Sequence, residues 1–353
     1  MRVVVTGASG NVGSQVVEQL LAHPAVSAVV GIARRPPVGL EPAVQWHALD
    51  LAVDDLRPAL RGADAVVHLA WLLQPAHHPD RMAQVNLGGT SRLLDAIHDE
   101  AVPVLVHASS VGAYSPGPKH PRVDEAHPTG GIASSTYSQH KSQAEALLDS
   151  FGRSHPDTRI VRIRAGIVLQ ASAASELARY FLGPFVPQRL LRRSLLPVVP
   201  RTPGLVIQAV HARDLAAAYV SAVTEPVHGA FNVAAEPVLD VDTIGAALQA
   251  RPVPVPQAVL RGLVEGAWRL RLIPTDPGWL DLAVQTPLMD TSRARKELHW
   301  SPSTPADAAL RETLDAMSTG AGGASQVLRP RATGLQRLAE VIRGVTPGAG
   351  GTG

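Results

Sequence analysis

One tyrosine and one lysine stand at a spacing that suits proton transfer. Tyr137 and Lys141 are four residues apart, so a helix through them places both side chains on one face. Lysine is rare in this chain, and Lys119 and Lys296 are the other two. An ammonium beside a phenol stabilises the phenolate and lowers the pKa of the tyrosine. The pair therefore predicts general acid/base catalysis by Tyr137 at a carbonyl or an alcohol.

Two serines end an apolar run that precedes this helix. Ser109 and Ser110 follow Val104–His107, which has the valine-rich character of a buried strand. In open α/β folds, ligands bind at the carboxyl ends of the parallel strands. A serine hydroxyl at that edge can hydrogen-bond a reacting oxygen and stabilise its developing charge.

A glycine-rich loop lies between the first apolar run and the first amphipathic segment. Gly7 allows a tight turn, Gly10 lets the backbone approach a pyrophosphate, and Gly13 lets the helix pack closely on the strand. The backbone N–H groups at the helix start favour phosphate. The loop predicts a dinucleotide site formed by Thr6, Gly7, Ser9, Gly10, Asn11, Val12 and Gly13.

The end of the second apolar run bears on the choice between the two nicotinamide cofactors. NAD-preferring proteins usually carry an acid there, which holds the ribose hydroxyls of the adenosine. This chain has Arg34 and Arg35 instead. Two guanidinium groups can hold a 2′-phosphate through forked hydrogen bonds, so NADP is favoured over NAD. Two solvated surface arginines are the alternative interpretation.

Short apolar runs alternate with segments of helix length through the first half of the chain. This alternation predicts an α/β fold, with a Rossmann-like, doubly wound parallel sheet. The predicted strands are Val3–Val5, Ala28–Ile32, Val44–His47, Ala65–Leu69, Val104–His107 and Arg159–Ile163. The predicted helices are Val12–Ala22, Arg81–Asp99 and Thr136–Phe151. A strand and helix follow at Leu205–Val223, and a short strand at Phe231–Val233.

Composition excludes several classes of function. A formal net charge of +2 does not suggest a nucleic-acid partner. The chain has no cysteine, and adjacent histidines such as His77 and His78 are more often solvated than metal-bound, so no metal site is predicted. No apolar run reaches the roughly 18 residues of a membrane span, and no signal peptide precedes the first strand. A cytoplasmic protein without membrane contact is therefore expected.

These motifs, in this order, resemble the extended short-chain dehydrogenase/reductase superfamily, also called the NAD(P)-dependent epimerase/dehydratase family. The likeness covers about residues 1–315. Besides the glycine loop and Tyr137-x-x-x-Lys141, it includes several short runs. They are Asp50-Leu51, His68-Leu69-Ala70, Asn86-Leu87-Gly88-Gly89-Thr90, Ser109-Ser110 with Tyr114, Val210 to Ala216, Phe231-Asn232-Val233, and Asp290 to Arg293.

The resemblance implies roles for further residues. Ser110 would be the catalytic serine, and Asn86 would support the active-site helix or backbone. Asp50 and Leu51 would contact adenine, while Leu69, Ala70 and Ala108 would line the cofactor groove. It also implies a smaller C-terminal substrate lobe interleaved with returning Rossmann elements, and a homodimer formed through Arg81–Asp99 and Thr136–Phe151. Such a dimer requires those helices to have apolar exposed faces.

The chain departs from the nucleotide-sugar members of this family at two places. Those members usually carry an Asn that helps to hold the sugar diphosphate, and Ile167 stands at that position here. Sugar 4,6-dehydratases place an Asp-Glu pair after the catalytic hydroxyl, where this chain has Val111 and Gly112. The first departure argues against a nucleotide-sugar substrate, and the second argues against the elimination that a 4,6-dehydratase carries out.

The expected domain boundaries follow from these patterns. Residues 1–170 form the Rossmann domain, and 205–234 return to it. Residues 171–204 and 235–317 form the substrate lobe. Residues 318–353, rich in Gly, Ala, Thr and Pro, form a mostly disordered tail.

Three functions remain open at this point. The favoured one is an NAD(P)-dependent oxidoreductase that acts on a carbonyl or secondary alcohol of a small, fairly apolar metabolite. The second is a nucleotide-sugar epimerase that uses bound cofactor without net redox change. The third is a catalytically idle cofactor-binding scaffold or sensor, because a fold does not guarantee chemistry.

Overall fold

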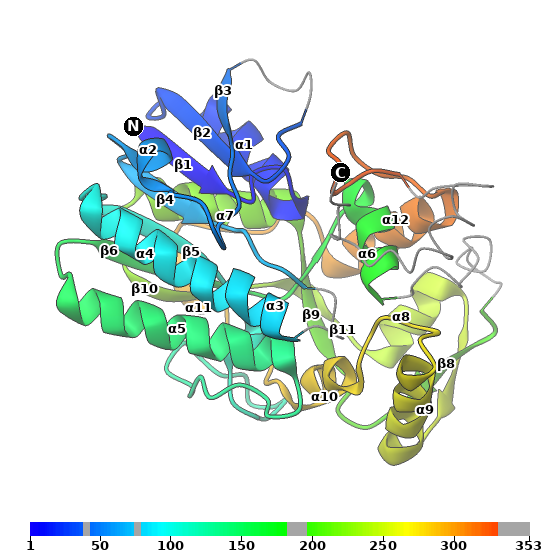
Figure 1. Ribbon diagram of the computed structural model, residues 1–353. Helices are drawn as coiled ribbons and strands as arrows, with labels where there is room; N and C mark the ends of the chain where they lie inside the picture. The colour runs from blue at the N-terminus through cyan, green and yellow to red at the C-terminus, as the bar shows by residue number, and fades with distance from the viewer. Residues whose placement is uncertain (38–42, 74–78, 182–195, 331–353) are drawn as a thin grey trace.

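A seven-stranded parallel sheet forms the centre of the molecule. The computed structural model describes residues 1–37, 43–73, 79–181 and 196–330 (Figure 1). The strand order is β10-β6-β5-β4-β1-β2-β3, and each neighbouring pair is parallel. The strands are β1 (Arg2–Thr6), β2 (Ala28–Ala33), β3 (Val44–Ala48), β4 (Ala65–His68), β5 (Val104–Ser110), β6 (Arg159–Ala165) and β10 (Gly229–Val233). The predicted Rossmann-like fold and its six N-terminal strands are confirmed.

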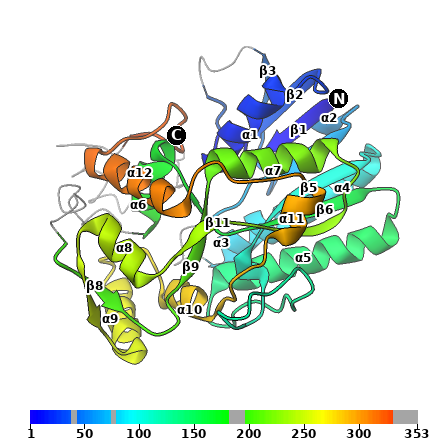
Figure 2. The same cartoon turned by 180° about the vertical axis from the view of Figure 1, so that it is seen from behind.

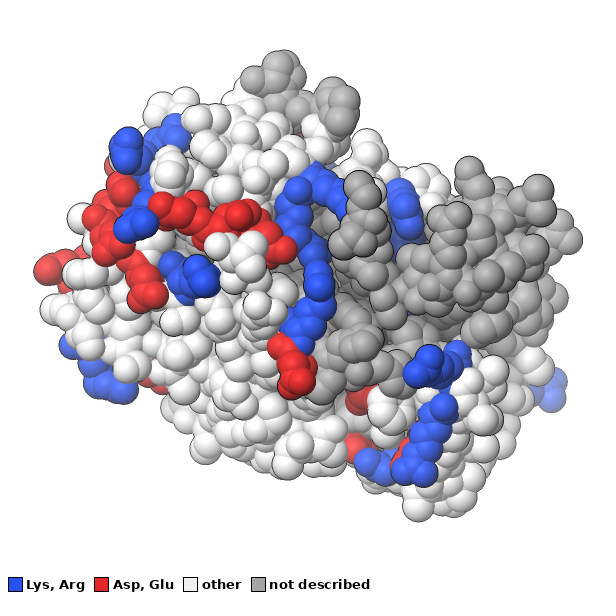
Figure 3. Space-filling view, viewed as in Figure 1, with Lys and Arg blue, Asp and Glu red and all other residues white. Residues whose placement is uncertain are grey.

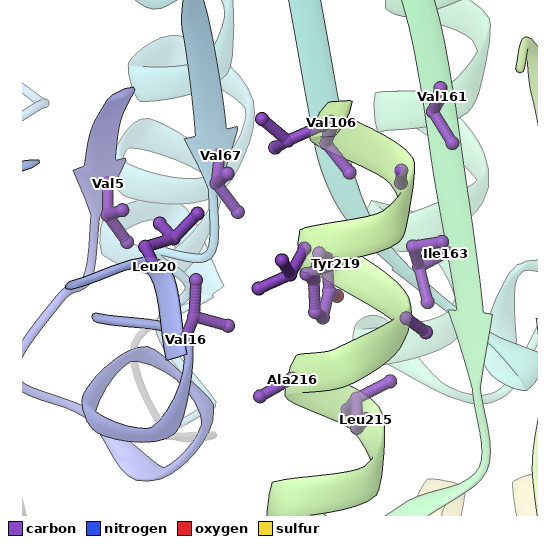
Figure 4. Close-up of a cluster of buried hydrophobic side chains, with 14 of the residues drawn as sticks. Val5, Val16, Leu20, Val67, Val106, Val161, Ile163, Leu215, Ala216 and Tyr219 are labelled. Atoms are coloured by element: carbon purple, nitrogen blue, oxygen red, sulfur yellow. The ribbon is translucent and has the colours of Figure 1, made fainter. Parts of the chain in front are cut away.

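Helices cover both faces of this sheet, because successive residues of a buried strand point to opposite sides. Val3 and Val5 pack with α1 (Asn11–Ala22) and α7 (Ala212–Thr224). Val4 packs on the other face, with α4 (Gly89–Asp99), α5 (Thr136–Ser154) and the short α2 (Arg57–Leu60). Figure 4 shows Leu20 and Tyr219 of the first layer gathered with the valines of the central strands.

The predicted helix Arg81–Asp99 is present, but it is interrupted by a π-helical turn. It consists of α3 (Pro79–Ala83), a π-helical turn η1 (Gln84–Gly88) and α4. A π-turn inserts an extra residue into a helix and is frequent at functional sites. Here it carries Asn86, whose side chain is buried. The extra residue turns Asn86 inward.

A second lobe lies beside the large domain (Figures 1 and 2). Its three-stranded sheet has the order β11-β9-β7, and a two-stranded sheet pairs β12 with β8. The strands are β7 (Ile167–Leu169), β8 (Val198–Arg201), β9 (Ile207–His211), β11 (Ala235–Leu239) and β12 (Arg251–Pro254). The helices are η3 (Ala171–Ala173), α6 (Ala174–Phe181), α8 (Val241–Leu248), α9 (Gln257–Arg269), α10 (Pro277–Gln285) and α12 (Ala306–Thr319).

The chain passes between the two lobes at finer intervals than the sequence indicated. Within 205–234, α7 and β10 join the large domain, whereas β9 pairs with β7 and β11 in the small sheet. Within 235–317, α11 (Ser292–Glu297) returns to the large domain, because Ala294 and Trp300 pack into the core of the α1 and α7 layer. Hydrophobic periodicity identifies a strand but not the sheet that it joins.

The first part of the expected tail is packed rather than disordered. The Ser325 hydroxyl donates to the carbonyl oxygen of Ser9 at 2.7 Å. The Ser175 hydroxyl of α6 donates to the Ala321 carbonyl oxygen at 2.6 Å, and Leu328 is 3% exposed. Local composition did not indicate these contacts, because they join segments far apart in the chain. Residues 331–353, including the helix expected at 335–343, lie outside the described residues.

No helix within the described ranges is both long and apolar enough to cross a membrane.

Candidate active site

The glycine loop is closed so tightly that side chains are excluded from it. Gly7 has φ +68°, and a Cβ there would lie 2.8 Å from the backbone nitrogen of Ala70. A Cβ on Gly13 would lie 2.1 Å from the carbonyl oxygen of Gly7. Gly10 caps α1 without any side-chain hydrogen bond to the helix N-terminus. The first N–H groups of α1 are thus left for an anion, which fits the pyrophosphate of a dinucleotide.

A buried chain of hydrogen bonds ties this loop to the strand beside it. The Thr90 hydroxyl donates to the Asn86 carbonyl oxygen at 2.6 Å, so it accepts from Nε2–H of His68 at 3.1 Å. Nδ1 of His68 then accepts from the Thr6 hydroxyl at 2.7 Å, and the Thr6 oxygen accepts from the Ala70 N–H. Burial lowers the pKa of His68 to about 3, so the ring is neutral. This series of hydrogen bonds fixes the backbone of Ala70 against the glycine loop.

Asn86 holds the segment that follows β4. Its Oδ1 accepts from the Leu72 N–H at 2.7 Å, and its Nδ2 donates to the Leu72 carbonyl oxygen at 3.0 Å. Asn86 is 1% exposed. The family resemblance gave Asn86 a role in supporting the active-site helix or backbone, and here it holds the peptide groups on both sides of Leu72, the residue after Trp71.

Ser110 and Tyr137 meet at the end of β5. The Ser110 oxygen accepts from the Gly112 N–H at 3.0 Å, and the Ser110 hydroxyl also hydrogen-bonds the Tyr137 phenol. A Cβ on Gly112 would lie 2.9 Å from Cε1 of Tyr137, so only glycine leaves room for the ring. Tyr137 lies in the first turn of α5, whose N-terminus is capped by the side chain of Ser135.

Lys141 lies on the same side of α5 as Tyr137, and its amine is directed away from bulk water. Its Nζ donates to the Ala108 carbonyl oxygen at 2.6 Å and lies 3.5 Å from the ring centre of Trp71. The distance from Nζ to the ring centre of Tyr137 is 5.9 Å. Burial lowers the pKa of Lys141 to about 7, and the nearby Glu145 carboxylate opposes this.

The expected lowering of the tyrosine pKa is wrong for this structure. Burial raises the pKa of Tyr137 to about 12, and only the hydrogen bond from Ser110 acts in the opposite direction. The reason is desolvation, which penalises the phenolate of Tyr137 and the ammonium of Lys141 in the same dry environment. Both groups therefore favour their neutral forms.

A buried ion pair supports this part of the sheet. The Arg164 guanidinium donates to both carboxylate oxygens of Glu145, at 2.8 and 2.5 Å, and the Ser109 hydroxyl donates to the same carboxylate at 2.5 Å. A further nitrogen of Arg164 donates to the Tyr114 hydroxyl at 3.0 Å. Glu145 follows Lys141 by one helical turn, and Ser109 precedes Ser110. This pair was not foreseen from the sequence, although the i, i+4 spacing from Lys141 was a signal for Glu145.

The other predicted cofactor residues surround the loop in different ways. Arg34 and Arg35 are exposed just after β2. The Asp50 carboxylate accepts from the Ala52 N–H within its own turn, and Leu51 is 7% exposed in the core. Three of the remaining residues accept hydrogen bonds through their carbonyl oxygens: Ser9 from the Ser325 hydroxyl, Ala108 from the Lys141 amine, and Asn11 from the Gln170 amide. Leu69 packs on the hydrophobic core, and Val12 lies in the first turn of α1.

Two aromatic residues at the site were not foreseen. Trp71 carries the Lys141 amine on its face, and the ring of Trp279, from α10 of the small lobe, stacks on Tyr137 at 4.8 Å and 28°. Trp71 directly follows the recognised His68-Leu69-Ala70 run, which was a usable signal. Nothing in the sequence connects Trp279 with Tyr137.

In the described part of the chain, no three residues of the types His, Asp and Glu are grouped so that they could hold a metal ion. His77 and His78 lie outside the described residues.

The fold and the site together define a class of protein. The chain matches the model of the NAD dependent epimerase/dehydratase family over residues 3–234, and it belongs to that family. The family resemblance seen in the sequence is therefore confirmed.

Two curated relatives illustrate the range of the family. The chain is 29% identical over 249 residues to the L-arabinose 1-dehydrogenase (NAD(P)(+)) of Haloferax volcanii, covering 60% of this chain and 89% of that protein. It is 26% identical over 315 residues, 88% of its own length, to an uncharacterized protein of Mycobacterium tuberculosis. The chain spans only 29% of the length of that relative.

Solved structures share the fold. The UDP-glucose 4-epimerase of Thermus thermophilus in complex with NAD superimposes with a TM-score of 0.65 at 23% identity, covering 90% of this chain and 99% of that one. A short-chain dehydrogenase/reductase superfamily protein from Agrobacterium tumefaciens with bound NAD gives 0.66 at 24%, covering 97% and 100%. At these identities the solved structures show a shared fold.

Proposed function

We propose that this protein is an NADP-dependent oxidoreductase that acts on a carbonyl or secondary alcohol of a small, fairly apolar metabolite. The observation that carries the proposal is a continuous set of contacts from the phosphate loop to the proton donor. Gly7 packs on Ala70, the next residue Trp71 carries the amine of Lys141, and Tyr137 lies on the same helix with its phenol bonded to Ser110.

The residues of the loop fit a nicotinamide dinucleotide. The glycine cradle that a Cβ would fill and the uncapped start of α1 would hold the pyrophosphate. Arg34 and Arg35 would hold the 2′-phosphate of NADP, because both are exposed and no acid ends β2. When bound, the nicotinamide supplies or accepts the hydride of the redox step.

The protein's own part is proton transfer at the substrate oxygen. With a pKa near 12, Tyr137 keeps its proton at neutral pH and can donate it to a carbonyl oxygen that gains negative charge. The Ser110 hydroxyl lies beside the phenol and would hydrogen-bond the same oxygen. Lys141 would hold the ribose of the nicotinamide. The protonated phenol is the form that carbonyl reduction requires.

The test is NADPH consumption with a panel of small ketones and aldehydes. Tyr137→Phe removes only the phenolic oxygen, so it is expected to lower kcat by about 10²- to 10⁴-fold, the range for general acid catalysis. NADPH binding by the variant, followed by fluorescence, serves as the control for folding. Mutant turnover equal to that of wild type would refute the mechanism. Arg34→Ala should raise the KM for NADPH more than that for NADH.

An epimerase that acts on a nucleotide sugar is the second candidate, because solved UDP-glucose 4-epimerases share this fold. Against it, the side chain of Ile167 is apolar and 40% exposed where nucleotide-sugar members carry Asn. An epimerase would convert UDP-glucose to its C4 epimer with no net consumption of NADPH. Product analysis by NMR distinguishes the two functions.

A homodimer through α4 and α5 remains without structural support. The exposed residues of α4 include Arg92, Asp95 and Asp99, and those of α5 include Asp149 and Arg153. Figure 3 shows acidic and basic side chains over the part of the surface where α4 lies. The apolar exposed faces that such a dimer requires are absent from these two described helices.

A further inference from the structure

Three aromatic side chains from distant parts of the chain gather around Tyr137. The ring of Trp279 stacks on that of Tyr137 at 4.8 Å, and Phe181 packs its ring edge-on against Trp279 at 5.1 Å and 87°. Trp71 is connected to Tyr137 through the Lys141 amine, which is 3.5 Å from the centre of the Trp71 ring and 5.9 Å from that of the Tyr137 ring. We call Trp71, Tyr137, Phe181 and Trp279 the aromatic cluster.

This cluster is unusual for the chain. Aromatic residues make up only 4% of the sequence. Tyr114, Tyr219, Phe231 and Trp300 lie inside the cores with 3% exposure or less, whereas all four members of the cluster are partly exposed, as Trp46, Tyr180 and Trp268 are elsewhere in the chain. Two members come from the large domain and two from the small lobe, so the cluster lies where the lobes meet over the proposed proton donor.

The charges around the cluster restrict what it can bind. A cationic ligand would meet the Lys141 amine, which already lies on the face of Trp71. On the helix that carries Trp279, the carboxylate of Asp281 is 4% exposed and held by Arg261, with Nε 3.1 Å from both oxygens. It is therefore not free to bind the hydroxyl groups of a sugar. Within the described ranges, the four members of the cluster themselves offer mainly apolar ring surface.

We propose that Trp279 and Phe181 are specificity-determining residues, and that the substrate carries its carbonyl or alcohol on a flat, apolar ring. This inference rests on the proposed function and names its substrate class. A flat ring can stack on the indole of Trp279 in an offset or edge-on arrangement, while a puckered ring or a linear chain of equal size cannot. Because Trp279 lies against the Tyr137 ring, a substrate ring held by Trp279 would keep its exocyclic oxygen near the phenol.

Three methyl ketones of eight carbons separate these possibilities: acetophenone, cyclohexyl methyl ketone and 2-octanone. With wild type, NADPH consumption should show a KM for acetophenone about 3- to 10-fold below that for cyclohexyl methyl ketone, the range of one aromatic pair. Trp279→Leu should remove this difference by raising the acetophenone KM, with kcat less affected. Trp279→Phe should retain it. Trp46→Phe, on the edge strand β3, is the matched control and should change neither KM.

Binding of 1-phenylethanol, measured by calorimetry on the full chain, gives a second readout that needs no turnover. Weaker binding to Trp279→Leu than to wild type and Trp279→Phe supports the inference. Equal KM values for the three ketones in wild type, or equal binding to all variants, would overturn it, as would tighter binding of UDP-glucose than of 1-phenylethanol. If wild type binds 1-phenylethanol through Trp279 but consumes no NADPH with any ketone, the proposed function is wrong, while the role of Trp279 in binding an aromatic ring is supported.

Discussion

Replacement of Arg164 by methionine tests whether the buried ion pair supports the site. Arg164 is 5% exposed and Glu145 2%. The guanidinium makes two hydrogen bonds to Glu145 and one each to the Tyr114 hydroxyl and the Glu125 carbonyl oxygen. In Arg164→Met, the Glu145 carboxylate keeps only its bond from Ser109.

The expected loss is large because a buried charge is left without its partner. Breaking one half of a buried ion pair costs about 3–5 kcal/mol of the free energy of unfolding. Arg162→Met is the matched control, two residues earlier on the same strand. Arg162 bonds Asp149, whose side chain is 52% exposed, so its removal should cost about 1 kcal/mol or less. A double variant, Arg164→Met with Glu145→Leu, should recover much of the loss, because no unpaired charge remains.

The loss should also depend on pH. In the wild type, burial raises the pKa of Glu145, but the hydrogen bonds and charge of Arg164 more than offset this, and the net pKa lies below its usual value. The pair thus contributes stability above the usual carboxyl pKa and loses it as the pH falls through the lowered one. In Arg164→Met, burial raises that pKa and only the Ser109 hydrogen bond and the charge of Arg162 oppose it, so the cost of the ionised form is present at pH 8 and diminishes toward pH 5.

Urea unfolding followed by circular dichroism at pH 8 and pH 5 measures these differences. The reasoning is refuted if Arg164→Met costs no more than Arg162→Met at pH 8, or if its cost is the same at both pH values.

Three further predictions concern single contacts. Gly13→Ala should destabilise the fold by about 1–3 kcal/mol and abolish NADPH binding, because its Cβ would lie 2.1 Å from a carbonyl oxygen of the loop. Gly262→Ala should instead stabilise the fold by about 0.5–1 kcal/mol in the same urea assay, because a Cβ at this position of α9 meets open space. Lys119→Met removes an ammonium that donates to three backbone carbonyl oxygens and should cost about 3 kcal/mol; a loss below about 1 kcal/mol would contradict this. Ser325→Ala should cost about 1 kcal/mol, whereas Ser318→Ala, whose hydroxyl bonds within α12, should show a smaller change in thermal unfolding.

The sequence by itself determined the features that depend on neighbours along the chain. The valine runs, the glycines at 7, 10 and 13, and the i, i+4 spacing of Tyr137 and Lys141 each specify a strand, a turn or a helix face through local geometry. Because the Rossmann sheet repeats one local unit, these signals also predicted its parallel strands and the placing of Ser110 at the carboxyl end of β5.

Only the tertiary structure decided what depends on contacts between distant residues. Desolvation, which is set by everything packed around a group, raised the pKa of Tyr137 where its spacing from Lys141 had predicted a lower one. The stacking of Trp279 on Tyr137 and the hydrogen bond from Ser325 to Ser9 join residues 142 and 316 positions apart, so no periodicity or motif could reveal them. Sequence patterns specify elements, and the packing of those elements sets the environment in which their side chains ionise and bind.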